Sequence, residues 1–327
     1  MEIIRADHSG FCFGVEKAID KTFERIDKAK HDCRTTYTCG NLIHNKSVTD
    51  KVASMGVKMI TSLDEAEEGD VVIVRSHGEP KEFYDEAESK GIELIDTTCI
   101  FVTKIHKLVL EAYEEGRPVI IVGNANHQEV KATNGWCHYS GTILENEDEA
   151  ENFVKSFDSY KIPLIVCQTT IRRELLDSIL RIFDKASIRY EIKNTICNAT
   201  RDRQESCAEL ATKVDLMVVI GDPNSSNSKK LYEIAKKNCK NAIFIQDISD
   251  LELKELGKYN KIGVTAGAST PEWIIKEVIA SMSENVTANV DHNPMLDFMD
   301  DIENSLRLPR PGEIVDGTVH QVMENEV

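Results

Sequence analysis

Three cysteines in this 327-residue chain share one local setting, a position between a predicted β-strand and a predicted α-helix. They are Cys12, Cys99 and Cys197, spaced by 87 and 98 residues. The unpaired N–H groups and the dipole at a helix N-terminus favour a thiolate over a thiol. A thiolate in this position is a nucleophile or a ligand of a metal or cluster. One such cysteine could equally be a buried core residue, but the threefold recurrence favours ligation.

Three cysteines can hold three corners of an iron–sulfur cube and leave the fourth iron open to a substrate. Clusters that only transfer electrons usually have four cysteine ligands. Zinc is the less favoured alternative, because structural zinc sites usually contain closely spaced cysteine pairs and the chain has no C-x-x-C. Six further cysteines lack this setting, and we interpret them as buried or incidental thiols: Cys33, Cys39, Cys137, Cys167, Cys207 and Cys239.

Polar side chains follow other predicted strands, at points where helices begin. They include His44, His77, His127, Thr169, Ser225, Ser226, Asn227 and Ser269. Unpaired N–H groups at helix N-termini suit a phosphate group, although any one of these side chains could instead be a cap or a satisfied core residue. A Walker A loop and a G-x-G-x-x-G turn are both missing, so nucleotide binding is not indicated. Glu129 is the candidate proton donor; its alternative role is a first-turn glutamate that the helix dipole favours.

The elements that position these side chains form a repeat of alternating strands and helices. Such alternation predicts βαβ units with parallel sheets, whose ligand-facing loops lie beyond the carboxyl ends of the strands. We therefore predict an α/β fold of three units with small parallel sheets, aimed at a shared centre. The expected units are residues 13–97, residues 98–194, and residues 1–12 together with 195–283.

Composition limits the classes of function. The net charge of −17, from 39 basic and 56 acidic residues, argues against nucleic-acid binding by residues 1–283. No apolar run approaches the ~18 residues needed to span a membrane, and the N-terminus lacks the apolar stretch of a signal peptide. We expect a cytoplasmic protein with no membrane partner. Nine cysteines, an odd number, argue against a disulfide framework.

Over roughly residues 1–282 the sequence resembles the 4-hydroxy-3-methylbut-2-enyl diphosphate reductase family of the non-mevalonate isoprenoid pathway. Together the motifs are highly specific. They are Gly10-Phe11-Cys12-Phe13-Gly14-Val15, His44-Asn45, Ser76-His77-Gly78, Asp96-Thr97-Thr98-Cys99, His127-Gln128-Glu129-Val130, Gln168-Thr169-Thr170, Cys197-Asn198-Ala199-Thr200, Asn224-Ser225-Ser226-Asn227-Ser228 and Val264-Thr265-Ala266-Gly267-Ala268-Ser269.

The resemblance implies a pseudo-threefold α/β fold around a 4Fe–4S cluster on Cys12, Cys99 and Cys197, with one open iron. It implies that the allylic hydroxyl of the diphosphate substrate leaves as water, using two electrons from an external ferredoxin- or flavodoxin-type donor and two protons. The products would be isopentenyl and dimethylallyl diphosphates. Glu129 would donate the proton, with His127 and Thr169 as further catalytic residues. The implied diphosphate ligands are His44, His77, His127, Ser225, Ser226, Asn227 and Ser269.

Other interpretations stay open at this point. Quinolinate synthase also has three α/β units and three cysteines on an open-site cluster, and a hydro-lyase on such a cluster would need no external electrons. A non-enzyme alternative is an iron–sulfur sensor or RNA-binding protein.

The tail has a resemblance of its own. Residues 284–327 begin as an acidic linker, and residues 309–322 resemble the opening strand of ribosomal OB-type RNA-binding repeats. An OB barrel needs five strands. We therefore expect the reductase part of a longer fusion, in which a missing C-terminal extension could bind RNA.

Overall fold

The computed structural model describes residues 2–157 and 160–284, which belong to one compact unit. Except for Glu284, the predicted linker and OB-type strand at 284–327 lie outside the described residues. Within the described ranges, no helix has both the length and the apolar character needed to cross a membrane.

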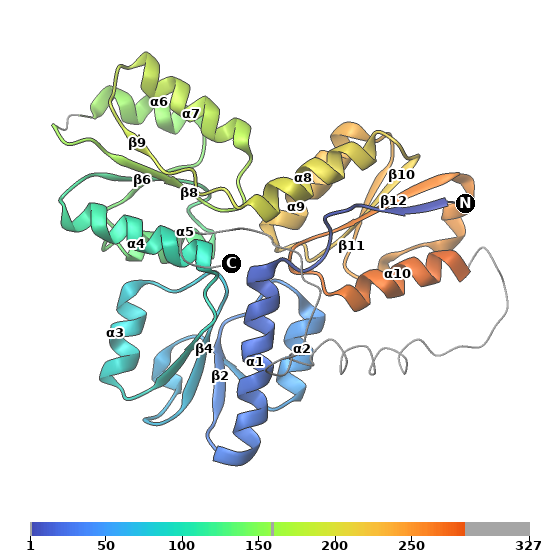
Figure 1. Ribbon diagram of the computed structural model, residues 1–327, viewed down its shortest axis with the longest axis horizontal. Helices are drawn as coiled ribbons and strands as arrows, with labels where there is room; N and C mark the ends of the chain where they lie inside the picture. The colour runs from blue at the N-terminus through green and yellow to red at the C-terminus, as the bar shows by residue number, and fades with distance from the viewer. Residues whose placement is uncertain (1, 158–159, 285–327) are drawn as a thin grey trace, which may run out of the picture. The chain divides into compact units, whose positions relative to one another are not determined.

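The described residues form three four-stranded sheets in which every strand pair is parallel. Each sheet carries its own helices, and Figure 1 shows the three sets as separate α/β lobes. The predicted fold class is therefore confirmed. The boundaries 13–97, 98–194, and 1–12 with 195–283 stay predictions.

The first sheet has the strand order β3-β2-β4-β5. Its strands and helices are α1 (Phe13–Asp32), β2 (Thr36–Cys39), α2 (Lys46–Ser54), β3 (Lys58–Ile60), β4 (Val71–Val74), α3 (Lys81–Ser89) and β5 (Glu93–Asp96), with a short 3-10 helix η1 (Leu63–Glu65). Ile19 and Ile26 of α1 share a core cluster with Val48 of α2 and Ile73 of β4. Burial of this apolar stripe fixes the direction of α1, whose N-terminus follows Cys12.

The second sheet has the strand order β7-β6-β8-β9. Its elements are α4 (Ile100–Glu114), β6 (Val119–Val122), α5 (Gln128–Gly135), β7 (Thr142–Leu144), α6 (Glu147–Ser156), β8 (Leu164–Cys167), α7 (Arg173–Lys185) and β9 (Glu191–Ile192). Side chains alternate across a strand. Ile120 and Val122 accordingly join the core cluster that includes Ile179 of α7, while Ile121 joins the one that includes Val109 of α4.

The third sheet has the strand order β1-β12-β10-β11. It places the N-terminal strand β1 beside a strand that lies more than 250 residues later in the sequence. Its elements are β1 (Glu2–Arg5), α8 (Asn198–Ala211), β10 (Leu216–Ile220), α9 (Ser226–Asn238), β11 (Ala242–Ile245), β12 (Lys261–Ala266) and α10 (Glu272–Glu284), with 3-10 helices η2 (Ile248–Asp250) and η3 (Leu253–Lys258). Glu2 pairs with Lys261 in the register of β1 and β12.

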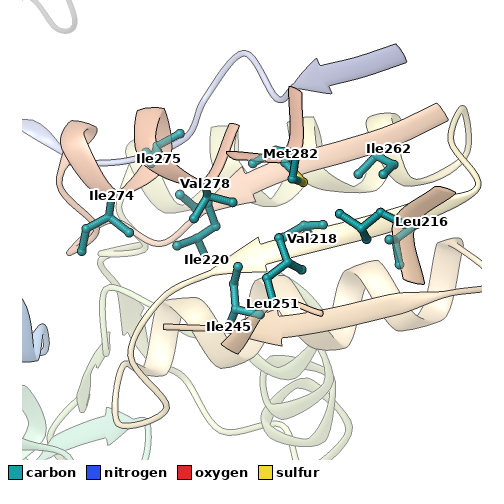
Figure 2. Packing of buried hydrophobic residues seen from close by; sticks show 13 residues of the cluster. Leu216, Val218, Ile220, Ile245, Leu251, Ile262, Ile274, Ile275, Val278 and Met282 are labelled. Atoms are coloured by element: carbon teal, nitrogen blue, oxygen red, sulfur yellow. The ribbon is translucent and has the colours of Figure 1, made fainter. Parts of the chain in front are cut away.

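Both faces of the third sheet are covered. Val218 and Ile220 pack with Ile275 and Val278 of α10, as Figure 2 shows. The alternate side chains of β10, including Met217, pack against α8 and α9. Parallel strands buried on both faces are nearly continuous apolar runs, and each fully buried aliphatic side chain stabilises the fold by about 1.5–3 kcal/mol.

The polar loops all follow strands, as the sequence predicts. His44, His77, His127, Thr169, Ser225 and Ser269 follow β2, β4, β6, β8, β10 and β12 in that order, and Cys12, Cys99 and Cys197 follow β1, β5 and β9. In parallel sheets ligands bind beyond the carboxyl ends of the strands. The fold therefore gives each lobe three such connections with which to build a site.

Candidate active site

One pocket collects every side chain that the sequence singles out. Its lining includes the three cysteines, the three histidines, Glu129 with Thr169, and four polar residues of the third lobe: Cys12, Cys99, Cys197, His44, His77, His127, Glu129, Thr169, Ser225, Ser226, Asn227 and Ser269. All three lobes contribute, although the residues are spread over more than 250 positions of sequence.

The cysteine wall consists of Cys12, Cys99 and Cys197. Each is the N-cap residue of its helix (α1, α4 or α8), and none uses its side chain to cap that helix. The sulfur atoms are therefore free for another partner. Gly14 makes room for two of them, because a Cβ atom placed on Gly14 would lie 2.6 Å from Sγ of Cys99 and 4.0 Å from Sγ of Cys12.

Burial outweighs the helix N-termini in setting the charge of the cysteine wall. It raises the pKa of Cys99 to about 12, while backbone N–H groups of Phe101 and Val102 pull it down. Burial also raises the pKa of Cys197. The helix N-termini favour a thiolate, as expected, but burial is the larger effect and leaves the pKa of both residues raised. A thiolate here needs a bound cation, because an isolated charge is costly to bury.

The histidine wall consists of His44, His77 and His127, one from each of three loops. The ring centroids of His44 and His77 lie 5.1 Å apart, those of His77 and His127 5.5 Å, and those of His44 and His127 6.5 Å. Burial lowers all three pKa values, that of His127 to about 4 and that of His77 well below its usual value. The histidines are therefore neutral in the ligand-free protein at neutral pH.

A hydrogen bond of His127 shows which of its ring nitrogens carries the proton. It is the N-cap of α5, and its Nδ1 accepts a hydrogen bond of 3.2 Å from the backbone N–H of Glu129. An accepting Nδ1 carries no proton, so the neutral ring holds its proton on Nε2. His127 therefore has a ring donor left for a ligand.

Glu129 and Thr169 form a buried pair in the same pocket. Glu129 is 2% exposed. Its Oε1 accepts a hydrogen bond of 2.6 Å from the backbone N–H of Thr169, and its Oε2 lies 2.6 Å from the donating Oγ1 of Thr169. Burial raises the pKa of Glu129, and the two hydrogen bonds oppose that rise. A carboxyl group with a raised pKa next to a hydroxyl group can hold and pass on a proton.

The third lobe adds polar groups that are not satisfied within the protein. Nδ2 and Oδ1 of Asn227 are buried without hydrogen-bond partners, as is Nδ1 of His77. Ser225 is the N-cap of α9 and accepts from the N–H of Ser228, and Ser269 donates to the backbone oxygen of His44 at 2.9 Å. An unpaired buried polar group is costly, so the side chains of Asn227 and His77 are arranged for a ligand.

The pocket lining also includes Gly14, Ser76, Thr170 and Thr200. Each belongs to a motif recognised above, which was the available signal, but their types do not reveal their contacts. Oγ1 of Thr170, for example, lies 3.2 Å from Oγ of Ser226 and connects the second lobe to the third.

The arrangement differs from a site for one metal ion. Within residues 2–157 and 160–284, no three or more His, Cys, Asp or Glu residues are grouped to hold a single ion. The three cysteines approach the pocket from three separate helices, which suits a larger group with several attachment points.

Comparison with known proteins identifies the family. The model of the LytB protein family matches residues 3–283. The chain belongs to the LytB family. Among its LytB relatives, a 4-hydroxy-3-methylbut-2-enyl diphosphate reductase from Alkaliphilus oremlandii is 43% identical over 285 residues, which cover 85% of this chain and 98% of the relative.

A second relative is longer than this chain. The protein of the same name from Clostridium acetobutylicum is 40% identical, and the alignment covers 100% of this chain but 50% of that protein. The predicted fusion stays a prediction.

Two solved LytB-like structures bear names that agree with these relatives. One is described as (E)-4-hydroxy-3-methyl-but-2-enyl diphosphate reductase, the terminal enzyme of the non-mevalonate pathway; it is 35% identical, with a TM-score of 0.65, and covers 87% of this chain and 100% of its own. The other is E-1-hydroxy-2-methyl-but-2-enyl-4-diphosphate reductase from Plasmodium falciparum, 27% identical with a TM-score of 0.79, covering 94% and 99%.

Proposed function

We propose that this LytB chain is a 4-hydroxy-3-methylbut-2-enyl diphosphate reductase. It removes the allylic hydroxyl group of its substrate with two electrons and two protons, which gives isopentenyl and dimethylallyl diphosphates. The observation that carries the proposal is the single pocket, in which the cysteine wall, the histidine wall and the Glu129–Thr169 pair meet. Relatives and solved structures with this name extend over most of the chain.

The cysteine wall fits a 4Fe–4S cluster with three protein ligands and one open iron. Cys12, Cys99 and Cys197 have free side chains at three helix N-termini, and the bare backbone of Gly14 leaves space between two of them. When bound, such a cluster supplies electrons and Lewis acidity that side chains cannot supply. The electrons come from an external carrier, for which we propose a ferredoxin or flavodoxin type.

The histidine wall and the start of α9 fit the diphosphate group. The free Nε2–H of His127, the unpaired amide of Asn227 and the hydroxyl groups of Ser225 and Ser226 are donors of the kind that phosphate oxygens accept. Ser269 would join them by turning its hydroxyl group away from the backbone oxygen of His44. The histidines are neutral before binding. An arriving anion favours their charged form, so binding draws in protons and strengthens as the pH falls.

Glu129 and Thr169 fit the delivery of a proton to the leaving hydroxyl group. Burial raises the pKa of Glu129, which favours its protonated form, and the hydroxyl of Thr169 lies 2.6 Å from Oε2. Thr169 can accept that proton while it donates its own to the substrate. A proton donor in this position contributes typically ~10²–10⁴-fold to a rate.

The test is anaerobic reconstitution with iron and sulfide, followed by assay with the allylic diphosphate and a reduced one-electron donor. We expect a visible absorbance band and electron-dependent formation of the two products. Turnover without any electron donor would identify a hydro-lyase instead. A protein that carries a cluster yet leaves the substrate unchanged with the donor present would overturn the proposal.

A further inference from the structure

Arg203 of α8 is a buried cation that no role above includes. The residue is 6% exposed. Its Nε and Nη2 donate to the backbone oxygen of Gly10 at 3.2 and 2.9 Å, Nη2 also donates to that of Phe11 at 2.8 Å, and Nη1 donates to that of Ala199 at 2.8 Å. One guanidinium group thus joins the loop that ends at Cys12 to the first turn after Cys197.

The loop that Arg203 holds has little freedom to adjust. Gly10 has a φ of +89°, and a Cβ atom added there would lie 2.8 Å from Cδ1 of Ile275. The N–H groups of Gly10 and Cys12 donate to the backbone oxygens of Ala266 and Ala268. The segment is therefore fixed on the side of β12 by the backbone and on the side of α8 by Arg203.

The charge of Arg203 is not neutralised by an ion pair. Arg203 takes part in none of the ion pairs found among residues 2–157 and 160–284. Burial lowers the pKa of Arg203, and negative charge on Cys12, Cys197 or the neighbouring Asp202 opposes that shift. Arg25 is a useful contrast, because it is 5% exposed, forms an ion pair with Asp32 and lies on α1 among residues of the first lobe.

A buried cation without a carboxylate partner needs compensation from another negative group. An iron–sulfur cluster is held by cysteine thiolates, so the loaded site carries negative charge, and each electron added to the cluster increases it. A fixed positive charge beside them stabilises the loaded state and, more strongly, the reduced state.

We propose that Arg203 is a positioning residue for the cluster, which fixes the Cys12 loop against the Cys197 helix and raises the reduction potential of the bound group. The inference rests on the proposed function, because it requires an iron–sulfur cluster on these cysteines. It does not require that the substrate be correct.

Three variants separate charge from geometry. Arg203→Gln removes the charge, Arg203→Lys keeps the charge but cannot bridge the same carbonyl groups, and Arg25→Gln is the control for loss of a buried arginine. Each is reconstituted anaerobically and compared with the unmodified chain. The readouts are iron and sulfide per chain, the midpoint potential from a dye-mediated titration, and the melting temperature of the iron-free protein.

We expect Arg203→Gln to lower the one-electron reduction constant by about tenfold, a shift of roughly 59 mV to more negative potential. Arg203→Lys should lose part of its iron but keep nearly the original potential in the loaded fraction. Arg25→Gln should lower the melting temperature and leave the potential unchanged. If Arg203→Gln takes up too little iron to titrate, the proposal requires that its iron-free melting temperature fall less than that of Arg25→Gln.

Two results would overturn the role of Arg203. One is an unchanged potential in Arg203→Gln with full iron content, and the other is an iron loss that merely follows a large drop in iron-free melting temperature. Failure of the unmodified chain to bind any cluster would instead overturn the proposed function. The two failures are therefore distinguishable.

Discussion

The cysteine wall and the histidine wall line the same pocket and respond to burial in opposite directions. Burial raises the pKa of Cys99 to about 12 and lowers that of His127 to about 4. Both shifts favour the neutral form of these two side chains in the empty protein. The pocket can therefore remain buried in the empty protein without a large electrostatic penalty.

The two walls differ in what surrounds them. Each cysteine begins a helix, and Arg203 adds a positive charge near Cys12 and Cys197. Those surroundings favour negative charge once iron is bound. The histidines have the positive charge of Arg75 nearby, which further lowers the pKa values of His44, His77 and His127. An anion beside them would favour their cationic form, which agrees with the proposed diphosphate group as the ligand of the histidine wall.

Cys99→Ser should have the largest effect, because it removes one of the three proposed sulfur ligands of the cluster. We expect cluster content to fall to near zero and reductase activity to be lost. Cys239→Ser, a buried thiol outside the pocket, is the matched control and should keep both. A full-strength cluster spectrum in Cys99→Ser would remove that residue from the proposed ligands.

Glu129→Gln tests the Glu129–Thr169 pair, which lines the same pocket as the cysteine wall and the histidine wall. The amide can accept from the N–H of Thr169 and donate to its hydroxyl, so the shape of the pair is kept while the acidic proton is lost. We expect unchanged iron content and kcat lowered by at least ~10²-fold. Glu147→Gln on α6 is the control. Unmodified turnover in Glu129→Gln would leave Glu129 only a structural role in α5.

Gly14→Ala should affect the cysteine wall selectively. The new Cβ atom would lie 2.6 Å from Sγ of Cys99, but alanine is favoured over glycine in a helix by about 1 kcal/mol. We expect an iron-free melting temperature that is unchanged or higher, together with a several-fold loss of bound iron. Gly257→Ala, where a Cβ atom meets nothing within 4 Å, is the control. Equal iron content in the two variants would contradict the tight fit.

His127→Asn tests how the buried histidine wall makes the free energy of unfolding depend on pH. The folded pKa of about 4 lies below the usual 6.5, so the unfolded chain binds more protons between these values. Stability is therefore present above pH 6.5 and is lost as the pH falls towards 4. Asparagine keeps the N-cap of α5 without titrating.

We expect the variant to reduce the pH slope of the unfolding free energy by at most about 1.4 kcal/mol per pH unit, measured by urea titration of the iron-free protein. His8→Asn, at an exposed histidine outside the pocket, is the control. The same slope in His127→Asn and the unmodified chain would mean that His127 is not held neutral by burial.

The sequence could predict the fold class and the membership of the site because both depend on local patterns. Apolar runs such as Val71–Val74 mark buried strands, and Cys99 and His127 lie in the loops that follow β5 and β6. Parallel-sheet topology then brings those loop positions together. The site residues could therefore be named without knowing any contact between them.

Charge states and supporting contacts could not be predicted in this way. The pKa of Cys99 depends on burial by three lobes, and Arg203 contacts a carbonyl group 193 residues away. The unpaired amide of Asn227 is also invisible in the sequence, because lack of a partner is a property of the packed structure. These features depend on burial by residues distant in the sequence and on side-chain geometry, so local sequence patterns could not predict them.

The pairing of β1 with β12 has a consequence for how the protein is made. Cys12 follows directly on β1, whose parallel partner begins at Lys261. During synthesis the ribosome delivers β1 more than 250 residues before its neighbour β12, and such distant pairings form slowly. The first and second sheets can assemble while the third still lacks β12, the strand that joins β1 to β10. The cysteine nearest the start of the chain is thus the last of the three to be fixed, so cluster insertion belongs after translation of β12.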